Sequence, residues 1–561
     1  MNISFLSPLW QTVLFISSLL LVGFGQPAFS PWLSLLASFF GFALFWRIIV
    51  GLEKWKRRFW ISALWFFCVQ LIQLSWMVSH PYFYIYAVLA LIASFMGLQF
   101  GLLGILLERK RLEKLSYILA LAGFWTIMEW CRLFILSGFS FNPVGMALTA
   151  NLYSLQFASV WGIFGLSFWV IFVNLLALRV WLTRWPYLFS WGFAAMLPFI
   201  YGAIQLGIHQ KSFEKDQKNN SYTAILVQTA FPVEEIMGFK DQKSMIAYVM
   251  DEWRQILKIT KKHLGTSVDL IATPEYTVPY GTYSCVFPHS HVVKAFREIY
   301  GPEHLAKLPK LEAPYAMPFE TANGKVWMVN NAFWAQGIAN IFNAELVAGL
   351  EDSEDLSPHE RNYYSAALHF QPRKENEDPY LFNRYEKRVL VPMGEYIPSS
   401  FLKKLASWYG INGSFTPGQE AKAFGNKQKL GLSICYEETY GYIMRQSKLK
   451  GATVLLNLTS DVWYPYSRLM QQHFDHARPR TVENGMPLLR ACNTGITAAI
   501  DCFGRVSDVL GESPEKAEWL ADSIKVSVPT YTYPTVYSRF GDAFILSISF
   551  FAILVGLRFR P

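Results

Sequence analysis

The chain has 561 residues, of which 52% are hydrophobic and only 16% are charged. This composition excludes an ordinary soluble enzyme and indicates membrane-spanning segments beside at least one further domain. The net charge of +9 lies largely in short clusters between apolar segments, which argues against a nucleic-acid-binding protein. The six cysteines form no CxxC pair and no zinc-binding spacing.

The N-terminal part is a series of apolar runs, each near the roughly 20 residues that an α-helix needs to cross a bilayer. We expect a membrane domain over 1–208 with seven spanning helices, and an eighth helix near the C-terminus. The expected spans are 9–25, 30–50, 59–78, 82–107, 115–137, 155–178, 186–207 and 541–557.

Basic residues gather in every second loop between these spans. The other loops, 26–29, 79–81 and 138–154, contain no Lys or Arg. The positive-inside rule places the basic loops in the cytoplasm. We therefore expect both termini in the cytoplasm and everything between about residue 208 and the eighth span on the outside.

Two charged residues, Glu129 and Arg132, interrupt the fifth expected span. They are three residues apart and share one helix face. Charges at that depth must face protein or each other. We favour a structural ion pair that locks the bundle, and a role near a lipid-binding opening is the alternative.

The stretch 209–221 is polar, and we interpret it as a linker. Residues 222–530 have the character of an α/β domain, because short apolar runs alternate with segments of helical spacing. The expected strands are 224–227, 268–272, 326–329, 430–434, 454–458 and 495–500, and the expected helices are 240–262 and 470–484.

Three chemically active residues each lie beside a strand-like run. Glu275 follows 268–272 in Thr-Pro-Glu-Tyr, Lys387 lies in Tyr-Glu-Lys-Arg, and Cys435 ends 430–434 in Ile-Cys-Tyr-Glu. A thiol attacks a carbonyl only as thiolate, so it needs a base or a cationic neighbour, and the resulting oxyanion needs hydrogen-bond donors. Glu275 can supply the base and Lys387 the positive charge. The neighbouring candidates for a supporting role are Glu395, Tyr436 and Glu437.

The order Glu, Lys, Cys with these flanking residues resembles the catalytic set of the nitrilase superfamily. The surrounding sequence is most similar to the apolipoprotein N-acyltransferases, the membrane-bound branch of that superfamily. Asn457-Leu-Thr-Ser-Asp-Val-Trp463 and Arg490-Ala-Cys-Asn-Thr-Gly495 extend the resemblance. Two departures are the Tyr-Pro that follows Trp463 and the longer stretch 285–325.

The resemblance implies a four-layer αββα sandwich for 222–530 and a catalytic triad of Glu275, Lys387 and Cys435. It also implies transfer of an acyl chain, through a thioester on Cys435, from a membrane phospholipid to the α-amino group of a diacylglyceryl-modified N-terminal cysteine of an apolipoprotein. The expected location is the bacterial inner membrane with the catalytic domain in the periplasm. The resemblance implies no metal, organic cofactor or nucleic acid.

Two alternatives to acyl transfer remain at this stage. A membrane-tethered amidase would use the same triad with water as the acceptor. A scaffold or transporter with a degenerate domain would not need Cys435 for its function.

An aromatic cluster follows a strand at Trp463 and Tyr464. Aromatic residues favour the membrane interface, so these residues are candidates for lipid access to the site, with core packing as the alternative.

The remaining cysteines and histidines receive plainer interpretations. We expect Cys492 and Cys502 to be too far apart for a disulfide, unless the intervening strand folds back. Cys285 lies in a loop and has no identifiable partner. His473 and His476 share a helix face, but a third metal ligand is not evident, so a capping or packing role is favoured.

The charge asymmetry of the loops generates a topology prediction. Reporter fusions near residue 220 should be active only outside the cytoplasm, and fusions at the C-terminus only inside. A cytoplasmic reporter that is active near residue 220 would contradict the assignment.

Overall fold

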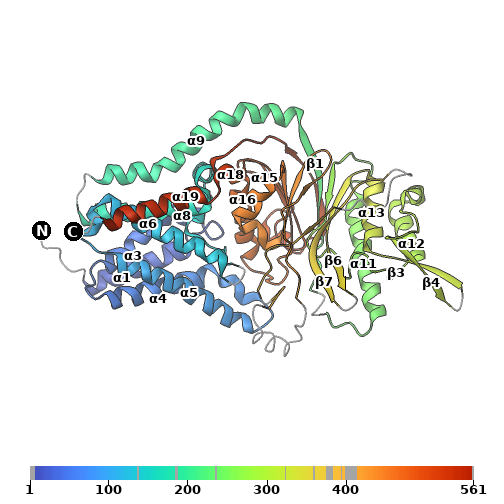
Figure 1. The fold of residues 1–561 in the computed structure, drawn as a ribbon, viewed down its shortest axis with the longest axis horizontal. Helices are drawn as coiled ribbons and strands as arrows, with labels where there is room; N and C mark the ends of the chain where they lie inside the picture. Colours follow the sequence, from blue (N-terminus) through green and yellow to red (C-terminus); the bar gives the residue numbers. More distant parts are fainter. Residues whose placement is uncertain are drawn as a thin grey trace.

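The computed structural model describes residues 7–135, 138–183, 187–233, 237–321, 324–357, 360–373, 383–392, 394–397 and 414–558. A bundle of helices forms one end of the molecule and a pair of β-sheets with flanking helices forms the other (Figure 1). The helix Pro8–Gly23 begins, and the helix Ala543–Arg558 ends, at the end of the bundle remote from the sheets (Figure 1). This arrangement is compatible with the expected topology, which stays a prediction.

Each expected span contains a described helix. These are α1 (Pro8–Gly23), α2 with α3 (Pro31–Leu36 and Phe42–Ile49), α4 (Trp55–Gln73), α5 (Tyr84–Leu106), α6 (Leu115–Cys131), α8 (Ala158–Leu182), α9 (Tyr187–Asn219) and α19 (Ala543–Arg558). Within the described residues, 5 helices are long and apolar enough to cross a membrane. The apolar helices at Pro8–Gly23 and Ala543–Gly556 are shorter, so the count of eight spans stays a prediction.

Packing of aromatic rings and one buried amide holds the bundle together. Phe45 stacks on Trp65 with 4.2 Å between ring centroids. Between α2 and α3 the chain forms a π-helix (Ala37–Gly41), which frees backbone groups in an apolar environment. The Asn174 side chain satisfies them, because it accepts from the Phe42 N–H at 2.9 Å and donates to the Ser38 carbonyl at 2.8 Å.

The ion pair expected in the fifth span is confirmed. Arg132 Nη1 lies 3.7 Å from Glu129 Oε1, and both side chains are buried. Glu129 also accepts from the Val144 N–H at 2.9 Å, and Arg132 donates to Gln99 at 2.6 Å. The pair therefore attaches the loop after α6 to the bundle, which favours the structural interpretation.

The expectation that 209–221 breaks a helix is wrong, because α9 continues as a helix to Asn219 (Figure 1), and the role of this stretch as a linker stays a prediction. Residues 209–219 contain no Gly or Pro and are rich in Lys, Gln and Glu, which favour helix. The His209 ring stacks on Tyr533 at 4.2 Å, and Phe213 packs in the same small cluster. These contacts anchor the helix where it joins the sheets.

The expected αββα layers are confirmed. One six-stranded sheet has the order β15-β1-β2-β6-β7-β8, and the other has the order β14-β13-β12-β11-β10-β9. Buried apolar side chains from both sheets, such as Leu226 and Leu432, form one cluster between them. Helices α11 and α13 pack on the first sheet, and α15 and α16 pack on the second.

The bounds of these elements follow. In the first sheet they are β1 (Ser221–Gln228), β2 (Leu270–Ala272), β6 (Glu345–Ser357), β7 (Glu360–Phe370), β8 (Asn383–Glu386) and β15 (Asp522–Pro529). In the second they are β9 (Ala423–Phe424), β10 (Leu430–Ile434), β11 (Val454–Thr459), β12 (Leu488–Cys492), β13 (Ala498–Ile500) and β14 (Val506–Val509). The helices are α11 (Gln242–Lys261), α13 (Asn331–Phe342), α15 (Gly441–Leu449) and α16 (Leu469–Asn484).

Most expected elements agree with these bounds, and two differ. The run 326–329 belongs to β5 (Gly324–Val329), which forms a separate three-stranded sheet with β3 (Phe287–Pro288) and β4 (Ala316–Thr321). The run 495–500 is shorter than expected, because Gly495 has φ +122° and the strand begins at Ala498. Strand β13 then pairs antiparallel with β12, so the chain folds back there.

Parallel pairing brings the ends of strands together at the site. Strand β10 runs parallel to β11, with Ile434 opposite Leu458, so the residues after both strands emerge at one edge. In the other sheet, β2 carries the chain toward Glu275, and β8 ends immediately before Lys387. The first sheet therefore positions Glu275 and Lys387, and the second sheet positions Cys435.

Close packing of α6 and α19 depends on Gly123. A Cβ at Gly123 would lie 2.7 Å from the Ser549 carbonyl oxygen. Gly123→Leu should therefore lower the free energy of unfolding by about 1–3 kcal/mol through overpacking. Thermal unfolding in detergent measures this. Gly192→Leu is the matched control, because no atom lies within 4 Å of a Cβ there, and equal losses in both variants would contradict the packing argument.

Candidate active site

Cys435 begins a short 3-10 turn (Cys435–Thr439) directly after β10. Its φ is +52°, which is rare for a residue with a side chain. Its carbonyl accepts from Asn457 Nδ2 at 3.2 Å and faces His473 Nε2 at 3.3 Å. In this strained conformation the Cys435 carbonyl points toward Asn457 and His473, and the thiol points in another direction.

The three expected catalytic side chains come together at this turn. Lys387 Nζ lies 2.9 Å from Glu275 Oε1. The charges of both groups act on the Cys435 thiol, which itself donates to the Ser460 carbonyl oxygen at 3.9 Å. Lys387 Nζ lies 2.7 Å from Glu395 Oε1, and the second oxygen of Glu395 accepts from the Val391 N–H at 2.8 Å. A base, a cation and a thiol thus share one partly closed site, and Glu395 orients the lysine.

Burial and charge set the protonation of these groups. Burial raises the pKa of the Glu275 carboxyl, and Lys387 opposes that shift. Burial lowers the pKa of Lys387, but Glu275 and Glu395 outweigh it and hold that pKa well above its ordinary value. Burial, followed by the charge of Glu275, raises the pKa of the Cys435 thiol well above its ordinary value. The resting thiol therefore keeps its proton, and Lys387 keeps its charge.

Glu437 fastens the cysteine turn to the lysine segment. Its Oε2 accepts from the Ile434 N–H and the Tyr385 hydroxyl, each at 2.8 Å. Its Oε1 accepts from the N–H groups of Arg388 at 2.6 Å and Val389 at 3.1 Å. Four donors saturate one buried carboxylate, so Glu437 acts on the positions of its neighbours and not as a proton carrier.

Tyr436 points away from the triad and toward the membrane helices. Its hydroxyl accepts from the Ser140 N–H at 3.1 Å, and its ring stacks on Phe141 with centroids 5.5 Å apart. Thr439 of the same turn hydrogen-bonds the Ser140 hydroxyl. The turn that begins with Cys435 is therefore attached directly to the loop after α6.

Trp463 and Tyr464 also lie at the seam between the two parts of the molecule. The Trp463 ring stacks on His80 at 5.6 Å, and the Tyr464 ring contacts Trp76 at 4.8 Å. Tyr464 and Cys435 pack against the same apolar cluster that contains the membrane helices. A role of these two aromatic residues in lipid access stays a prediction.

Sequence reasoning did not identify Glu438, Asp461 and Arg490 as part of the site. Glu438 Oε1 lies 2.8 Å from Arg490 Nε and 3.1 Å from His473 Nε2, and Asp461 Oδ1 lies 2.8 Å from His473 Nδ1. All four side chains are buried. Asp461 and Arg490 lie in stretches that carried the resemblance, but no local pattern indicated their contact.

The interpretations of the other cysteines and histidines can now be compared with the structure. In the described part of the chain, no group of three or more His, Cys, Asp or Glu side chains could hold a metal ion. Cys492 and Cys502 are both free. Although the chain folds back, the register that pairs Leu488 with Ile500 directs them to opposite ends of the hairpin. Cys285 is free and contacts Asn330 Nδ2 at 3.6 Å.

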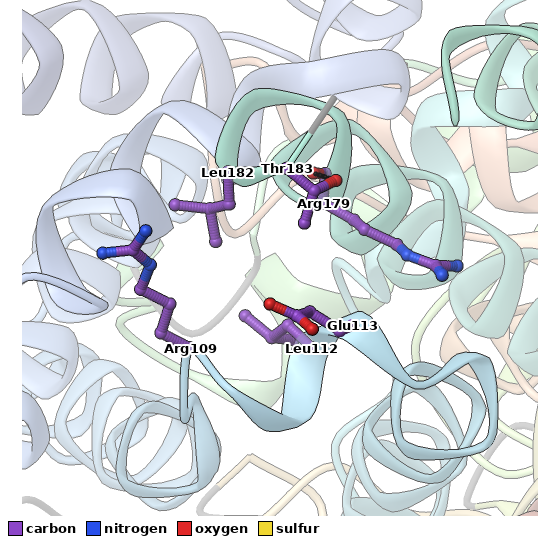
Figure 2. Close-up of a pocket in the computed structure, with 6 residues that line it drawn as sticks. All are labelled: Arg109, Leu112, Glu113, Arg179, Leu182 and Thr183. Carbon is purple, nitrogen blue, oxygen red and sulfur yellow. Dashed lines mark hydrogen bonds between the residues drawn. The ribbon is translucent and has the colours of Figure 1, made fainter. Parts of the chain in front are cut away.

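A small pocket lies far from this site, at the end of the bundle where α8 finishes (Figure 2). It is lined by Arg109, Leu112, Glu113, Arg179, Leu182 and Thr183. The Arg109 and Arg179 guanidinium groups point apart (Figure 2), so they do not converge on one ligand.

Comparisons with known proteins cover both parts of the chain. Residues 240–521 match the carbon-nitrogen hydrolase family, and residues 18–176 match the family described as the apolipoprotein N-acyltransferase N-terminal domain. The chain is 30% identical to an apolipoprotein N-acyltransferase of Chlamydia pneumoniae over 560 residues, which covers 96% of this chain and 95% of the relative. It is 30% identical to that of Chlamydia caviae, with 97% of each chain covered. It is 26% identical to that of Rickettsia prowazekii, covering 78% of this chain and 76% of the relative.

The charges around Cys435 generate a prediction on thiol reactivity. The rate of alkylation by iodoacetamide should still rise with pH above pH 9, because the thiol pKa is raised. Glu275→Gln should move this profile to lower pH, since it removes the negative charge that disfavours the thiolate. Mass spectrometry of the Cys435 peptide measures the rate. An unchanged or upward-shifted profile in Glu275→Gln would contradict the assigned electrostatics.

Proposed function

The chain belongs to the apolipoprotein N-acyltransferase family, and we propose that Cys435, Glu275 and Lys387 perform its N-acyl transfer through a thioester on Cys435. The observation that carries this proposal is the contact between Glu275 and Lys387 at 2.9 Å, beside a Cys435 thiol on which both charges act. A thiol with a base and a cation close by is what nucleophilic acyl transfer requires.

In the first half-reaction, Glu275 takes the thiol proton and the thiolate attacks an ester carbonyl of the donor lipid. The Lys387 ammonium donates a hydrogen bond to the oxyanion. The ester C–O bond breaks, the proton on Glu275 passes to the leaving alkoxide, and a lysolipid departs. The acyl chain remains on Cys435 as a thioester. The raised pKa of the resting thiol is consistent with a base that acts only once the substrate is bound.

In the second half-reaction, the amine of the apolipoprotein attacks the thioester carbonyl. Glu275 accepts a proton from the amine, the C–S bond breaks, and the cysteine is restored as the thiol when that proton returns. The product is an amide. Division into two steps means that two bulky lipid-anchored substrates need not occupy the site together.

The donor is proposed to be a membrane phospholipid, and the acceptor an apolipoprotein whose N-terminal cysteine carries a diacylglyceryl group. We further propose a bacterial inner-membrane location, with the catalytic domain in the periplasm and both termini in the cytoplasm. The Cys435 turn is hydrogen-bonded to the loop after α6, which holds Cys435 near the helix bundle. This position supports the proposed lipid-anchored substrates, because both would stay in the bilayer. Trp463 and Tyr464 lie at the same seam, which supports lipid access there.

The acyl-enzyme can be tested directly. Purified protein incubated with phospholipid alone should gain one acyl chain on Cys435, and neutral hydroxylamine should remove it because thioesters react readily with amines. Cys435→Ala should carry no label, and Cys435→Ser could retain a hydroxylamine-resistant ester. Acyl label that survives in Cys435→Ala would refute the mechanism.

The roles of the base and the cation generate a separate prediction. Glu275→Gln and Lys387→Ala should each lower turnover by about 10²–10³ or more, the loss typical of a missing transition-state interaction. Turnover is followed by mass spectrometry of a lipoprotein N-terminus, with thermal unfolding as the check on folding. A folded variant with near-normal turnover would remove that residue from the mechanism.

A further inference from the structure

A buried charged cluster that includes neither Glu275 nor Lys387 lies next to Cys435. It consists of His473 on α16, Asp461 after β11, Glu438 in the cysteine turn and Arg490 on β12. None of these side chains is more than 3% exposed. Four segments of the second sheet and its helix layer therefore meet at this point.

The hydrogen bonds of the cluster converge on His473. Its Nδ1 lies 2.8 Å from Asp461 Oδ1, and its Nε2 lies 3.1 Å from Glu438 Oε1 and 3.3 Å from the Cys435 carbonyl oxygen. Burial raises the pKa of Asp461, but His473 and Arg490 outweigh it and hold that pKa below its ordinary value. Each ring nitrogen thus faces oxygen atoms, Nδ1 that of Asp461 and Nε2 those of Glu438 and the Cys435 carbonyl.

Arg490 keeps the two carboxylates in place. Its Nε donates to Glu438 at 2.8 Å, its Nη1 donates to the Ile496 carbonyl at 2.9 Å, and its Nη2 lies 3.7 Å from Asp461 Oδ2. Buried charges are tolerated when they are paired and hydrogen-bonded. The position of the His473 ring is therefore determined by two carboxylates that are themselves fixed.

The contact with the Cys435 carbonyl matters because of the backbone at that residue. A left-handed conformation is strained for a residue with a side chain, and Cys435 has φ +52°. Among the described residues, only the side chains of Asn457 and His473 hydrogen-bond to its carbonyl oxygen. If the peptide relaxed, the thiol would turn away from Glu275.

We propose that His473 is a positioning residue for Cys435: held by Asp461 and Glu438, its ring fixes the Cys435 carbonyl and thereby aims the thiol at Glu275 and the incoming ester. The inference rests on the proposed role of Cys435 as the nucleophile. His473 makes no contact with the thiol in this arrangement, and its effect passes through the backbone. A displacement of about 1 Å at a reacting group can cost on the order of 10² in rate.

Three full-length variants in detergent test the proposal. His473→Leu removes the ring donors, and His473→Gln keeps an N–H donor that can reach the Cys435 carbonyl. His476→Leu is the matched control, because His476 is a buried histidine on the same helix whose Nδ1 has no hydrogen-bond partner within the described part of the chain. The readouts are single-turnover acylation of Cys435 by phospholipid at varied concentration and the pH profile of its alkylation by iodoacetamide.

We expect His473→Leu to lower the maximal acylation rate about 10²-fold, with little change in the phospholipid concentration at half-maximal rate. His473→Gln should recover a large part of the loss, and His476→Leu should acylate normally. The alkylation profile of His473→Leu should keep its midpoint pH, because Glu275, Lys387 and Asp461, whose charges act on the thiol, are all retained. Normal acylation in His473→Leu, or an equal loss in His476→Leu, would overturn the proposal.

Two further measurements distinguish failure of the positioning role from misfolding of a variant and from failure of the proposed function. If His473→Leu does not fold, Asp461→Asn replaces it and should show a smaller loss of maximal rate in the same direction, while an unchanged rate would count against the proposal. If wild-type protein forms no acyl-Cys435, the proposed function fails. The rate of Cys435 alkylation at saturating pH, compared between His473→Leu and His476→Leu, then still tests the positioning role, and equal rates would overturn it.

Discussion

The site depends on one buried ammonium placed between two carboxylates. Lys387 follows β8 of one sheet, Glu275 follows β2 of the same sheet, and Glu395 comes from the loop beyond Lys387. A buried charge without partners is costly, and removal of one partner from a buried pair typically costs about 3–5 kcal/mol. The pairing therefore fixes the relative positions of these segments, and it leaves Glu275 with one side free to face the thiol.

The second sheet contributes the nucleophile, and Glu437 joins it to the first. Its carboxylate accepts from backbone groups on both sides of the junction, at Ile434 before the cysteine and at Arg388 and Val389 after the lysine. Two sheets that pack only through apolar side chains could slide by fractions of an ångström. Hydrogen bonds to backbone N–H groups allow a narrower range of distances and angles than apolar contacts do. Glu437 therefore limits the movement of the Cys435 turn relative to the segment that carries Lys387.

The helix bundle is hydrogen-bonded to the segments around Cys435. The Glu129–Arg132 pair holds the loop after α6, and that loop bonds Tyr436 and Thr439 of the cysteine turn. On the other side, Glu483 of α16 accepts from the Ile163 N–H at 2.9 Å, where α8 is kinked at Gly162. The turn that begins with Cys435 therefore lies close to the bundle, as the proposed transfer between lipid-anchored substrates requires.

The sequence by itself determined the features that local patterns encode. Composition and apolar run length indicated the membrane helices, and the limits of Leu430–Ile434 agree with β10. The flanking residues of Glu275, Lys387 and Cys435 indicated the family, and the resemblance indicated the sandwich. These features depend on side-chain period and on short motifs, which can be recognised without knowledge of strand order.

Only the tertiary structure decided which distant residues meet. Lys387 and Glu275 are separated by 112 positions, and their contact follows from the order of the strands. The same is true of His473, whose hydrogen-bond partners lie on two other segments, and of β5, which joins a separate sheet. Helix α9 continues through a polar stretch because packing against Tyr533 supplements its propensity. The physical reason is common to all four: local patterns report burial and backbone preference, whereas partners are chosen by how the layers pack.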